Sequence, residues 1–453
     1  MPDSSNVPQV ILTPLKPALI AGVAQRLPVL VRVHAPDADP AQIKPRKPYS
    51  LALVIDRSGS MSGAPLREAV RCAAHIVGRL APGDTASLVV FDDRVRTLVA
   101  AQPVGDGKVF RGALAQVHEG GSTNLHGGWE VGAKSLQPGA AEAAIARVIL
   151  LSDGNANVGE VDPATIAAQC GAMAASGVTT STYGLGRQFN EDLMVAMAKE
   201  GQGNHYYGDS ASDLMEPFAE EFDLISSLYV RHVKLSLGAP DGVRIRLLND
   251  YPVEDREGFP LVRLPDIPWG SEAWAIVELE IDAGRAAEDG LQVLQAGVSG
   301  TTPEGEPVVF PEVVLHVRGM SPGAWDALLP DPLVAERLAE VETARILQQA
   351  RDAADAGDWA AIQALLATAR ERYAKYPWAL EVIESLAELA NPENILRFKK
   401  EALYSSRKMS TRLSDKEALS ALLQEDAKAS YLRRKKRQGK AQFDLPDDSA
   451  PSA

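Results

Sequence analysis

The most constraining feature of this chain is the apolar run Leu51–Ile55, which ends in the polar turn Asp-Arg-Ser-Gly-Ser. Five consecutive apolar residues before a glycine-containing turn predict a buried parallel strand that stops at its carboxyl end. Open α/β sheets place their ligands at that edge. Asp56, Ser58 and Ser60 bring one carboxylate and two hydroxyls to it. Hard oxygen donors without Cys or His favour Mg²⁺ or Mn²⁺ and argue against zinc or copper.

Two later segments can supply further oxygen ligands. Thr123 follows Gly-Gly-Ser in a glycine turn, and Asp153 ends a second apolar strand, 147–152. Because an octahedral ion takes six ligands, we expect both segments to approach the same point as the first motif. The alternative is that all of these residues only cap helices and form turns, as Ser, Thr and Asp often do. Their order and their places at strand ends and a glycine turn favour the metal site.

The ordered set Asp-x-Ser-x-Ser, Thr and Asp resembles the metal-ion-dependent adhesion site of bacterial von Willebrand factor type A domains. The resemblance implies that Asp56, Ser58, Ser60 and Thr123 bind Mg²⁺ or Mn²⁺ directly or through water. It implies that Asp153 often acts through water. It further implies that a Glu or Asp carboxylate of a protein partner fills the position that these ligands leave open. The resemblance therefore implies metal-dependent protein binding rather than turnover.

Strands and helices alternate between about residues 50 and 227, which predicts a doubly wound parallel sheet with helices on both faces. We assign residues 48–227 to this α/β domain. The predicted strands are 50–56, 85–92, 147–152, 178–184 and 203–207. The predicted helices are near 63–80, 125–137, 162–176, 190–200 and 211–226.

From residue 228 to 320 the pattern changes to short strands separated by Gly, Pro and Asp clusters, which predicts a β-sandwich. The strand candidates are 230–237, 243–247, 273–281, 291–298 and 308–317. Residues 1–47 contain strand-like segments at 8–13 and 17–34. We expect these segments to complete the sandwich, with the α/β domain inserted between its parts. Bacterial and inter-α-inhibitor-like relatives of similar layout support that arrangement.

Residues 321–435 are rich in Ala, Leu, Glu and Arg and predict a helical module. Pro332 stands at a first helical position after Asp331, and Ala356-Gly-Asp-Trp359 predicts the end of one helix and the cap of the next. Later helices are expected at 378–390, 392–406 and 414–433. The run Arg433–Arg437 is either a contact for an acidic partner, nucleic acid or membrane or a solvated helix end, and we favour the latter. Residues 436–453 are expected to be a disordered tail.

Charge and composition narrow the class of protein. The net charge of −14 argues against general binding of nucleic acids. The amino terminus resembles no signal peptide, and no apolar stretch reaches the length of a membrane span. Cys72 and Cys170, the only cysteines, lie within helical patterns, as buried thiols in a reducing compartment would. These features favour a cytoplasmic protein.

Two enzymatic interpretations are weaker. Ser58 or Ser60, His126 and Asp153 nominally supply a hydrolytic triad, but Met61 occupies the centre of the segment where a nucleophile elbow requires serine. A surface or helix-capping histidine is the more favoured role for His126. The chain also has no Gly-x-x-x-x-Gly-Lys-Ser/Thr sequence, so we expect no nucleotide hydrolysis by the chain itself.

The sequence thus predicts a non-enzymatic cytoplasmic adaptor or scaffold. It would bind a protein partner through a Mg²⁺ or Mn²⁺ ion held by Asp56, Ser58, Ser60, Thr123 and Asp153 and completed by a partner carboxylate. The alternative is a regulatory subunit or cofactor of a MoxR-type or chelatase-type AAA+ ATPase, because some bacterial relatives work beside such ATPases.

Overall fold

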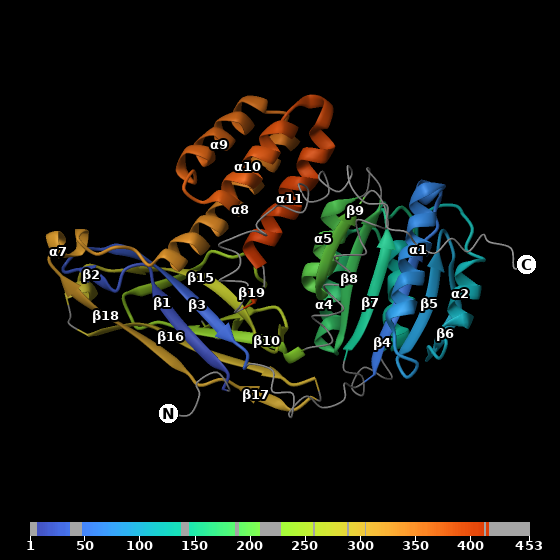
Figure 1. Ribbon diagram of the computed structural model, residues 1–453, viewed down its shortest axis with the longest axis horizontal. Helices are drawn as coiled ribbons and strands as arrows, with labels where there is room; N and C mark the ends of the chain where they lie inside the picture. The colour runs from blue at the N-terminus through green and yellow to red at the C-terminus, as the bar shows by residue number, and fades with distance from the viewer. Residues whose placement is uncertain are drawn as a thin grey trace, which may run out of the picture. The chain divides into compact units, whose positions relative to one another are not determined.

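The computed structural model describes residues 7–36, 48–136, 145–185, 190–208, 228–256, 259–287, 290–303, 305–411 and 414–415. Figure 1 shows their course from the amino-terminal strands to the last helices. The chain divides into two compact units. The first comprises Met1–Val341 and Arg407–Ala418, and the second comprises Glu342–Ser406 and Leu419–Ala453. This division falls inside a long helix, and the domain boundaries given above stay predictions.

The α/β part of the first unit contains a sheet of six described strands in the order β6-β5-β4-β7-β8-β9. All neighbours pair in parallel except β5 and β6. The short turn at 92–94 explains this exception, because so few residues can join only antiparallel neighbours. The strands are β4 (Tyr49–Asp56), β5 (Thr85–Phe91), β6 (Val95–Pro103), β7 (Ile145–Ser152), β8 (Val178–Leu185) and β9 (Gln202–Gly208).

Helices cover both faces of this sheet, as a strand buried along its whole length such as β4 requires. Leu53 and Ile55 pack in one core with Cys72 and Ile76 of the first helix. Val54 faces the other way, where it contacts Gly132. The doubly wound fold is therefore confirmed, with an antiparallel edge strand and one extra helix, α2, that the sequence did not predict. The helices are α1 (Ala64–Arg79), α2 (Lys108–Leu114), α3 (Leu125–Leu136), α4 (Pro163–Ala175) and α5 (Glu191–Glu200). The helix predicted at 211–226 lies outside the described residues.

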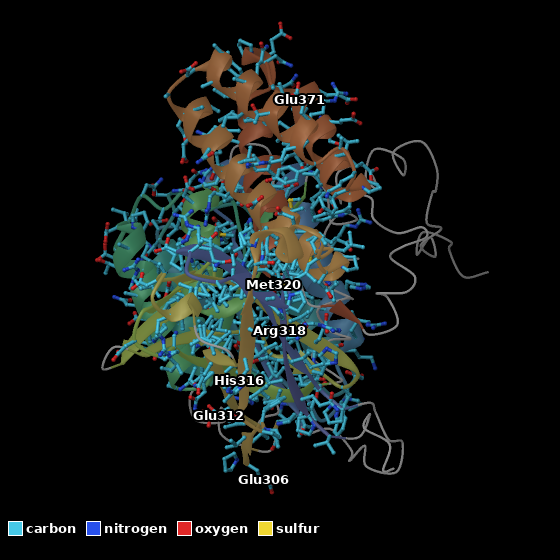
Figure 2. The ribbon with its side chains drawn as sticks, turned by 90° about the vertical axis from the view of Figure 1, so that its left-hand side faces the viewer. Glu306, Glu312, His316, Arg318, Met320 and Glu371 are labelled. Atoms are coloured by element: carbon cyan, nitrogen blue, oxygen red, sulfur yellow. The ribbon has the colours of Figure 1, made fainter. Side chains whose placement is uncertain are left out.

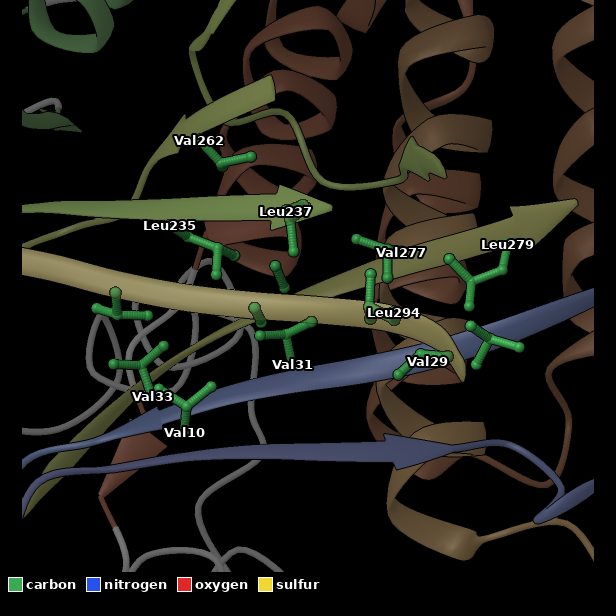
Figure 3. Close-up of a cluster of buried hydrophobic side chains, with 14 of the residues drawn as sticks. Val10, Val29, Val31, Val33, Leu235, Leu237, Val262, Val277, Leu279 and Leu294 are labelled. Atoms are coloured by element: carbon green, nitrogen blue, oxygen red, sulfur yellow. The ribbon is translucent and has the colours of Figure 1, made fainter. Parts of the chain in front are cut away.

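Two antiparallel sheets form the rest of the first unit's β structure. One has the order β1-β3-β15-β11, and the other has the order β12-β13-β10-β16-β18-β2, in which only the short β2–β18 pair is parallel. Their facing side chains form a shared apolar core, shown in Figure 3. The first sheet contains β1 (Gln9–Pro14), β3 (Gln25–His34), β11 (Val243–Leu247) and β15 (Ser271–Ile281). The second contains β2 (Ala18–Ile20), β10 (Leu228–Gly238), β12 (Val253–Arg256), β13 (Phe259–Arg263), β16 (Leu291–Thr301) and β18 (Val313–Met320).

The register of β3 shows how the α/β part is inserted. This strand precedes the α/β part, yet it pairs with β15 from Gln25↔Ile281 to His34↔Glu272. Strands from both sides of the insertion therefore share one sheet. Two short strands, β14 (Ile267–Pro268) and β17 (Pro307–Val309), extend the pairing of β10 and β16. Figure 2 shows His316, Arg318 and Met320 following one another along β18.

The predicted signals at Asp331 and at Ala356–Trp359 mark the start of α8 and the break between α8 and α9. The Asp331 carboxylate accepts a hydrogen bond from Val334 N (3.0 Å) where α8 begins, and Asp358 caps α9 through Ala361 N (2.9 Å). Ser414 and Asp415 contradict the helix predicted at 414–433, because they pair with β15 as the strand β19. The rest of that helix, the basic run 433–437 and the tail lie outside the described residues. The helices are α7 (Pro322–Asp326), α8 (Pro332–Asp355), α9 (Trp359–Arg372), α10 (Pro377–Leu389) and α11 (Ile395–Thr411).

Candidate metal centre

Asp56 is the last residue of β4, and its side chain is fully buried. One carboxylate oxygen accepts a hydrogen bond from Ser58 N (2.9 Å), and the other accepts one from Ser152 Oγ (2.6 Å). Burial raises the pKa of Asp56 to about 6, although these hydrogen bonds act in the opposite direction. The charge of Asp153 raises this pKa further, so the two carboxylates interact. A cation beside both groups would stabilise their ionised forms.

The two motif serines lie on the turn that follows β4. Their hydroxyl oxygens are 3.2 Å apart, and Ser58 is buried whereas Ser60 is exposed. The turn is a single 3₁₀ segment, η2 (Gly59–Met61), and the fully buried Met61 anchors it in the core below. One serine of the pair is therefore buried like Asp56, and the other is open to solvent.

Backbone hydrogen bonds tie the Thr123 turn to the other two ligand segments. Thr123 is buried, its N–H donates to Asn157 Oδ1 (2.7 Å), and its carbonyl accepts from Asn157 N (3.0 Å). Gly121 O accepts from Gly59 N (2.8 Å) in the serine turn. Hydrogen bonds thus join the Thr123 turn to the loop after β4 and to the loop after β7.

Asp153 follows β7, the direct neighbour of β4 in the sheet. It is buried, and its carboxylate accepts a hydrogen bond from Asn155 N (3.2 Å). Its carbonyl accepts from Asn190 N (2.7 Å), which joins this loop to the start of α5. The loop that carries Asp153 is thus joined to the start of α5, and the five-residue ligand set stays a prediction.

The donor chemistry fits a hard divalent cation. No three His, Cys, Asp or Glu side chains gather as a metal cluster anywhere in the described part of the chain. The candidate centre instead combines two carboxylates with three hydroxyls, an all-oxygen set that suits Mg²⁺ or Mn²⁺.

Ser152 and Asn157 are two supporting residues that the sequence did not reveal. The register places Ile55 opposite Leu151, so the next residues, Asp56 and Ser152, also lie side by side. Aligning the ends of the two apolar runs could have predicted the contact between Asp56 and Ser152. Nothing comparable marks Asn157, because its role depends on the conformation of a loop.

The sequence leaves two roles open for Arg57, which follows Asp56: a side chain at the rim that could steer an acidic partner, or one that faces solvent. Its guanidinium instead pairs with the Asp92 carboxylate and donates to His118 O (3.2 Å), which leaves only 14% of the side chain exposed. A Cβ at Gly120 would lie 2.0 Å from Asp92 Oδ2, so only glycine fits beside this pair. Arg57 therefore braces the loops under the candidate centre.

His126 does not complete a hydrolytic triad. Its Nε2 hydrogen-bonds to Gln169 Oε1 on α4, and its ring lies 5.9 Å from that of Trp129. The side chain is thus engaged between α3 and α4, and no described contact joins it to Ser58 or Ser60. This geometry gives the hydrolase interpretation no support.

Comparison with known proteins agrees with this fold. Residues 50–221 match the family model of the von Willebrand factor type A domain. The chain contains a von Willebrand factor type A domain. The solved von Willebrand factor type A protein from Catenulispora acidiphila superposes with a TM-score of 0.69 at 17% identity, covering 91% of this chain and 98% of that one. The ArnB paralog VWA2 from Sulfolobus acidocaldarius gives 0.55 at 19% identity, covering 89% and 99%. At these identities the likeness shows the fold alone.

Sequence relatives cover smaller shares. Protein sll0103 of Synechocystis is 26% identical over 269 residues, which are 57% of this chain and 62% of that protein. Human inter-alpha-trypsin inhibitor heavy chain H3 is 30% identical over 191 residues, which are 39% of this chain and 21% of the relative. The chain thus spans less than two thirds of either relative. Domains of this family commonly mediate protein–protein interactions. Among the described helices, none is both long and apolar enough to cross a membrane.

Proposed function

We propose that the von Willebrand factor type A domain of this chain binds a protein partner through a Mg²⁺ or Mn²⁺ ion. Asp56, Ser58, Ser60, Thr123 and Asp153 would hold the ion, and a Glu or Asp carboxylate of the partner would complete its ligand set. In this function the chain is an adaptor rather than an enzyme.

The buried Asp56 carboxylate is the observation that carries this proposal. An ionised carboxylate held away from water and close to Asp153 is unfavourable unless a cation or strong donors compensate it. Two donors are present, from Ser58 N and Ser152 Oγ, and each oxygen keeps a lone pair for another contact. A bound divalent ion would supply the missing positive charge.

The proposed ligand set also explains why a partner carboxylate fits. Asp56 and Asp153 together balance only the two charges of the ion, and the remaining proposed protein ligands are neutral hydroxyls. An ion held so weakly by protein charge retains affinity for one more anionic oxygen ligand. The proposal places the adaptor in a reducing compartment, which two buried free thiols, Cys72 and Cys170, support.

Calorimetry with Asp56→Ala and Asp56→Asn tests the metal ligand. We expect both variants to lose Mg²⁺ and Mn²⁺ binding while the circular dichroism spectrum stays that of the parent chain. Asp106→Asn is the matched control, because Asp106 is an exposed carboxylate beside α2 that pairs with Lys108. Undiminished Mg²⁺ affinity in Asp56→Ala would falsify the site.

Partner binding is tested separately. Cell extract is passed over the immobilised full chain in Mg²⁺ and again in EDTA, and retained proteins are identified by mass spectrometry. We expect a retained set that disappears both in EDTA and on the Asp56→Asn chain. A set that is identical in all arms would contradict metal-dependent binding.

A further inference from the structure

The loops around the candidate metal centre carry a strong excess of negative charge. At this edge of the sheet, the described residues of the loops and of the first turn of α5 are 57–63, 92–94, 115–124, 153–162 and 190–192. Apart from the ligand Asp153, they contain seven acidic side chains, and their only lysine or arginine residues are Arg57 and Arg94. We call five of these acidic residues the acidic rim: Asp93, Glu119, Glu160, Asp162 and Asp192.

The two arginines do not offset this charge for an incoming ligand. Arg57 is turned inward and paired with Asp92. Arg94 is exposed, and its Nε lies 3.7 Å from Asp93 Oδ2. The described cations of this edge therefore already face carboxylates of the same loops. A partner segment that approaches the ion meets a surface that remains net negative.

Two members of the acidic rim touch the ligand loops themselves. The Glu119 carboxylate accepts a hydrogen bond from the Ser62 hydroxyl, directly after the Asp-x-Ser-x-Ser turn. Asp93 lies over Gly121, where an added Cβ would be 2.9 Å from Asp93 Oδ1. The carbonyl of Gly121 in turn binds Gly59 N of the serine turn. Both carboxylates thus lie beside the proposed point of entry, and both are exposed.

The negative charge of the acidic rim repels the carboxylate of an approaching partner. The ion and its two acidic ligands are together neutral, so the negative charge of the acidic rim that Arg94 does not offset still acts on the incoming anion. Two unit charges about 8 Å apart in water change an affinity roughly twofold, and salt reduces this effect. Several such repulsions would make a carboxylate without neighbouring charges, or one flanked by acidic residues, a poor ligand. Cations on both sides of the carboxylate would instead be attracted to the acidic rim.

We propose that the domain selects a carboxylate that lies within a basic segment of its partner, with Lys or Arg on both sides of the coordinating Asp or Glu. The inference rests on the proposed function, because it assumes that the ion recruits a carboxylate. The acidic rim supplies the selectivity, and Asp93 and Glu119 are its specificity-determining residues.

Three synthetic nonapeptides test the proposal against the full chain. Each is acetylated and amidated, has one central Asp, and differs only in the four residues nearest it, which are Lys, Ser or Glu. Binding is measured by fluorescence anisotropy in millimolar Mg²⁺ at low ionic strength. We expect the Lys-flanked peptide to bind at least about tenfold more tightly than the Glu-flanked one, with the Ser-flanked peptide between them.

Variants and peptide controls separate the acidic rim from the overall negative charge of the chain. Asp93→Asn with Glu119→Gln should shrink the preference for Lys several-fold. The matched double variant Glu306→Gln with Glu312→Gln removes two exposed carboxylates of the β-sandwich, labelled in Figure 2, and should leave the preference unchanged. Replacing the central Asp of the Lys-flanked peptide by Asn, or adding EDTA, should abolish most of the binding.

The outcomes distinguish the two proposals. Mg²⁺-dependent binding of all three peptides with equal affinity overturns the basic-segment inference and leaves the proposed function standing. Lys-flanked binding that survives EDTA and the central Asn overturns the inference, because it reports only general attraction to an acidic protein. No Mg²⁺-dependent binding of any peptide contradicts the proposed function together with the inference.

Discussion

Ser152→Ala removes a hydroxyl that is not among the five proposed metal ligands. The variant tests whether the buried Asp56 carboxylate is oriented to bind a metal ion. Ser152 is fully buried at the end of β7. Its hydroxyl donates to Asp56 Oδ2 (2.6 Å) and accepts from Gly154 N (2.8 Å). The residue therefore fixes the orientation of Asp56 and holds the first turn of the loop that carries Asp153.

The expected size of the effect follows from these two bonds. Losing them leaves one carboxylate oxygen and one backbone N–H without their present partners in a buried place, which costs about 1–3 kcal/mol of stability. Partners that orient a metal ligand typically contribute at least about tenfold to metal affinity. We therefore expect Ser152→Ala to weaken Mg²⁺ binding about tenfold, or by about 1.4 kcal/mol.

Thermal unfolding with and without saturating Mg²⁺ measures both effects in one experiment. A ligand that binds only the folded state stabilises it in proportion to the logarithm of its affinity, so the variant should gain about 1.4 kcal/mol less from Mg²⁺ than the parent chain does. For a domain of this size, that is a difference of roughly 3–6 °C in the metal-induced rise of Tm. Isothermal calorimetry gives the affinity directly.

Ser87→Ala is the matched control. Ser87 is equally buried on the neighbouring strand β5, but its hydroxyl contacts Ser135 Oγ (2.9 Å) rather than Asp56. It should lower stability without changing the gain from Mg²⁺. If Ser152→Ala and Ser87→Ala gained the same stability from Mg²⁺ as the parent chain, Ser152 would have no role in metal binding and our reasoning about Asp56 would be refuted.

Three further predictions concern packing and pH. Gly132→Ala would place a methyl group 2.4 Å from Val54 Cγ2. It should lower the free energy of unfolding, measured in urea, by about 1–3 kcal/mol. Equal stability of the variant and the parent chain would mean that α3 can move away from β4. Gly78→Ala, in α1 with no atom within 4 Å of the added Cβ, should instead stabilise by up to about 1 kcal/mol, and a loss would contradict the open space there. Burial alone would raise the pKa of Glu272, but its contacts with His34 and Arg32 hold this pKa below the usual value of a glutamate. The stabilising contribution of the ionised Glu272 is therefore complete above about pH 4.3 and is lost as the pH falls further. Glu272→Gln should therefore reduce the loss of stability between pH 6 and pH 3.5 in urea titrations, and an unchanged loss would assign that dependence to other groups.

The sequence predicted the core of the α/β domain because its signals are local. Runs such as Leu51–Ile55 are apolar on every residue, which only a strand buried on both faces requires, and each run ends at a polar turn. The missed strand β6 lacks this signal, since most of its residues are exposed at the sheet edge. The pair β12 and β13 was also missed, because such short strands become regular only through pairing with each other and with β10.

The same local signals allow the segments of the candidate site to be predicted, but not the contacts between them. Its three ligand segments follow from motif order and from the fact that neighbouring parallel strands end at one edge. The contacts that organise the segments do not follow, because the Thr123–Asn157 and Arg57–Asp92 pairs depend on loop conformations with no periodic signal. The sequence also left Arg57 as a rim or solvent-facing residue, since it does not show that Asp92 lies beside it.

The topology places the candidate site at the edge of the sheet opposite to the start of β4. Tyr49 begins β4 at the amino edge, where the chain enters from the β-sandwich, and Leu228, which begins β10, packs in the same core as Tyr49. Asp56 and Asp153 lie at the carboxyl edge, after the full length of β4 and β7. An effect of partner binding on the β-sandwich that passes through the α/β domain would also appear in its strands and helices. A metal-induced change in amide exchange at β10 without one in β4, β7 or α5 would argue against this path.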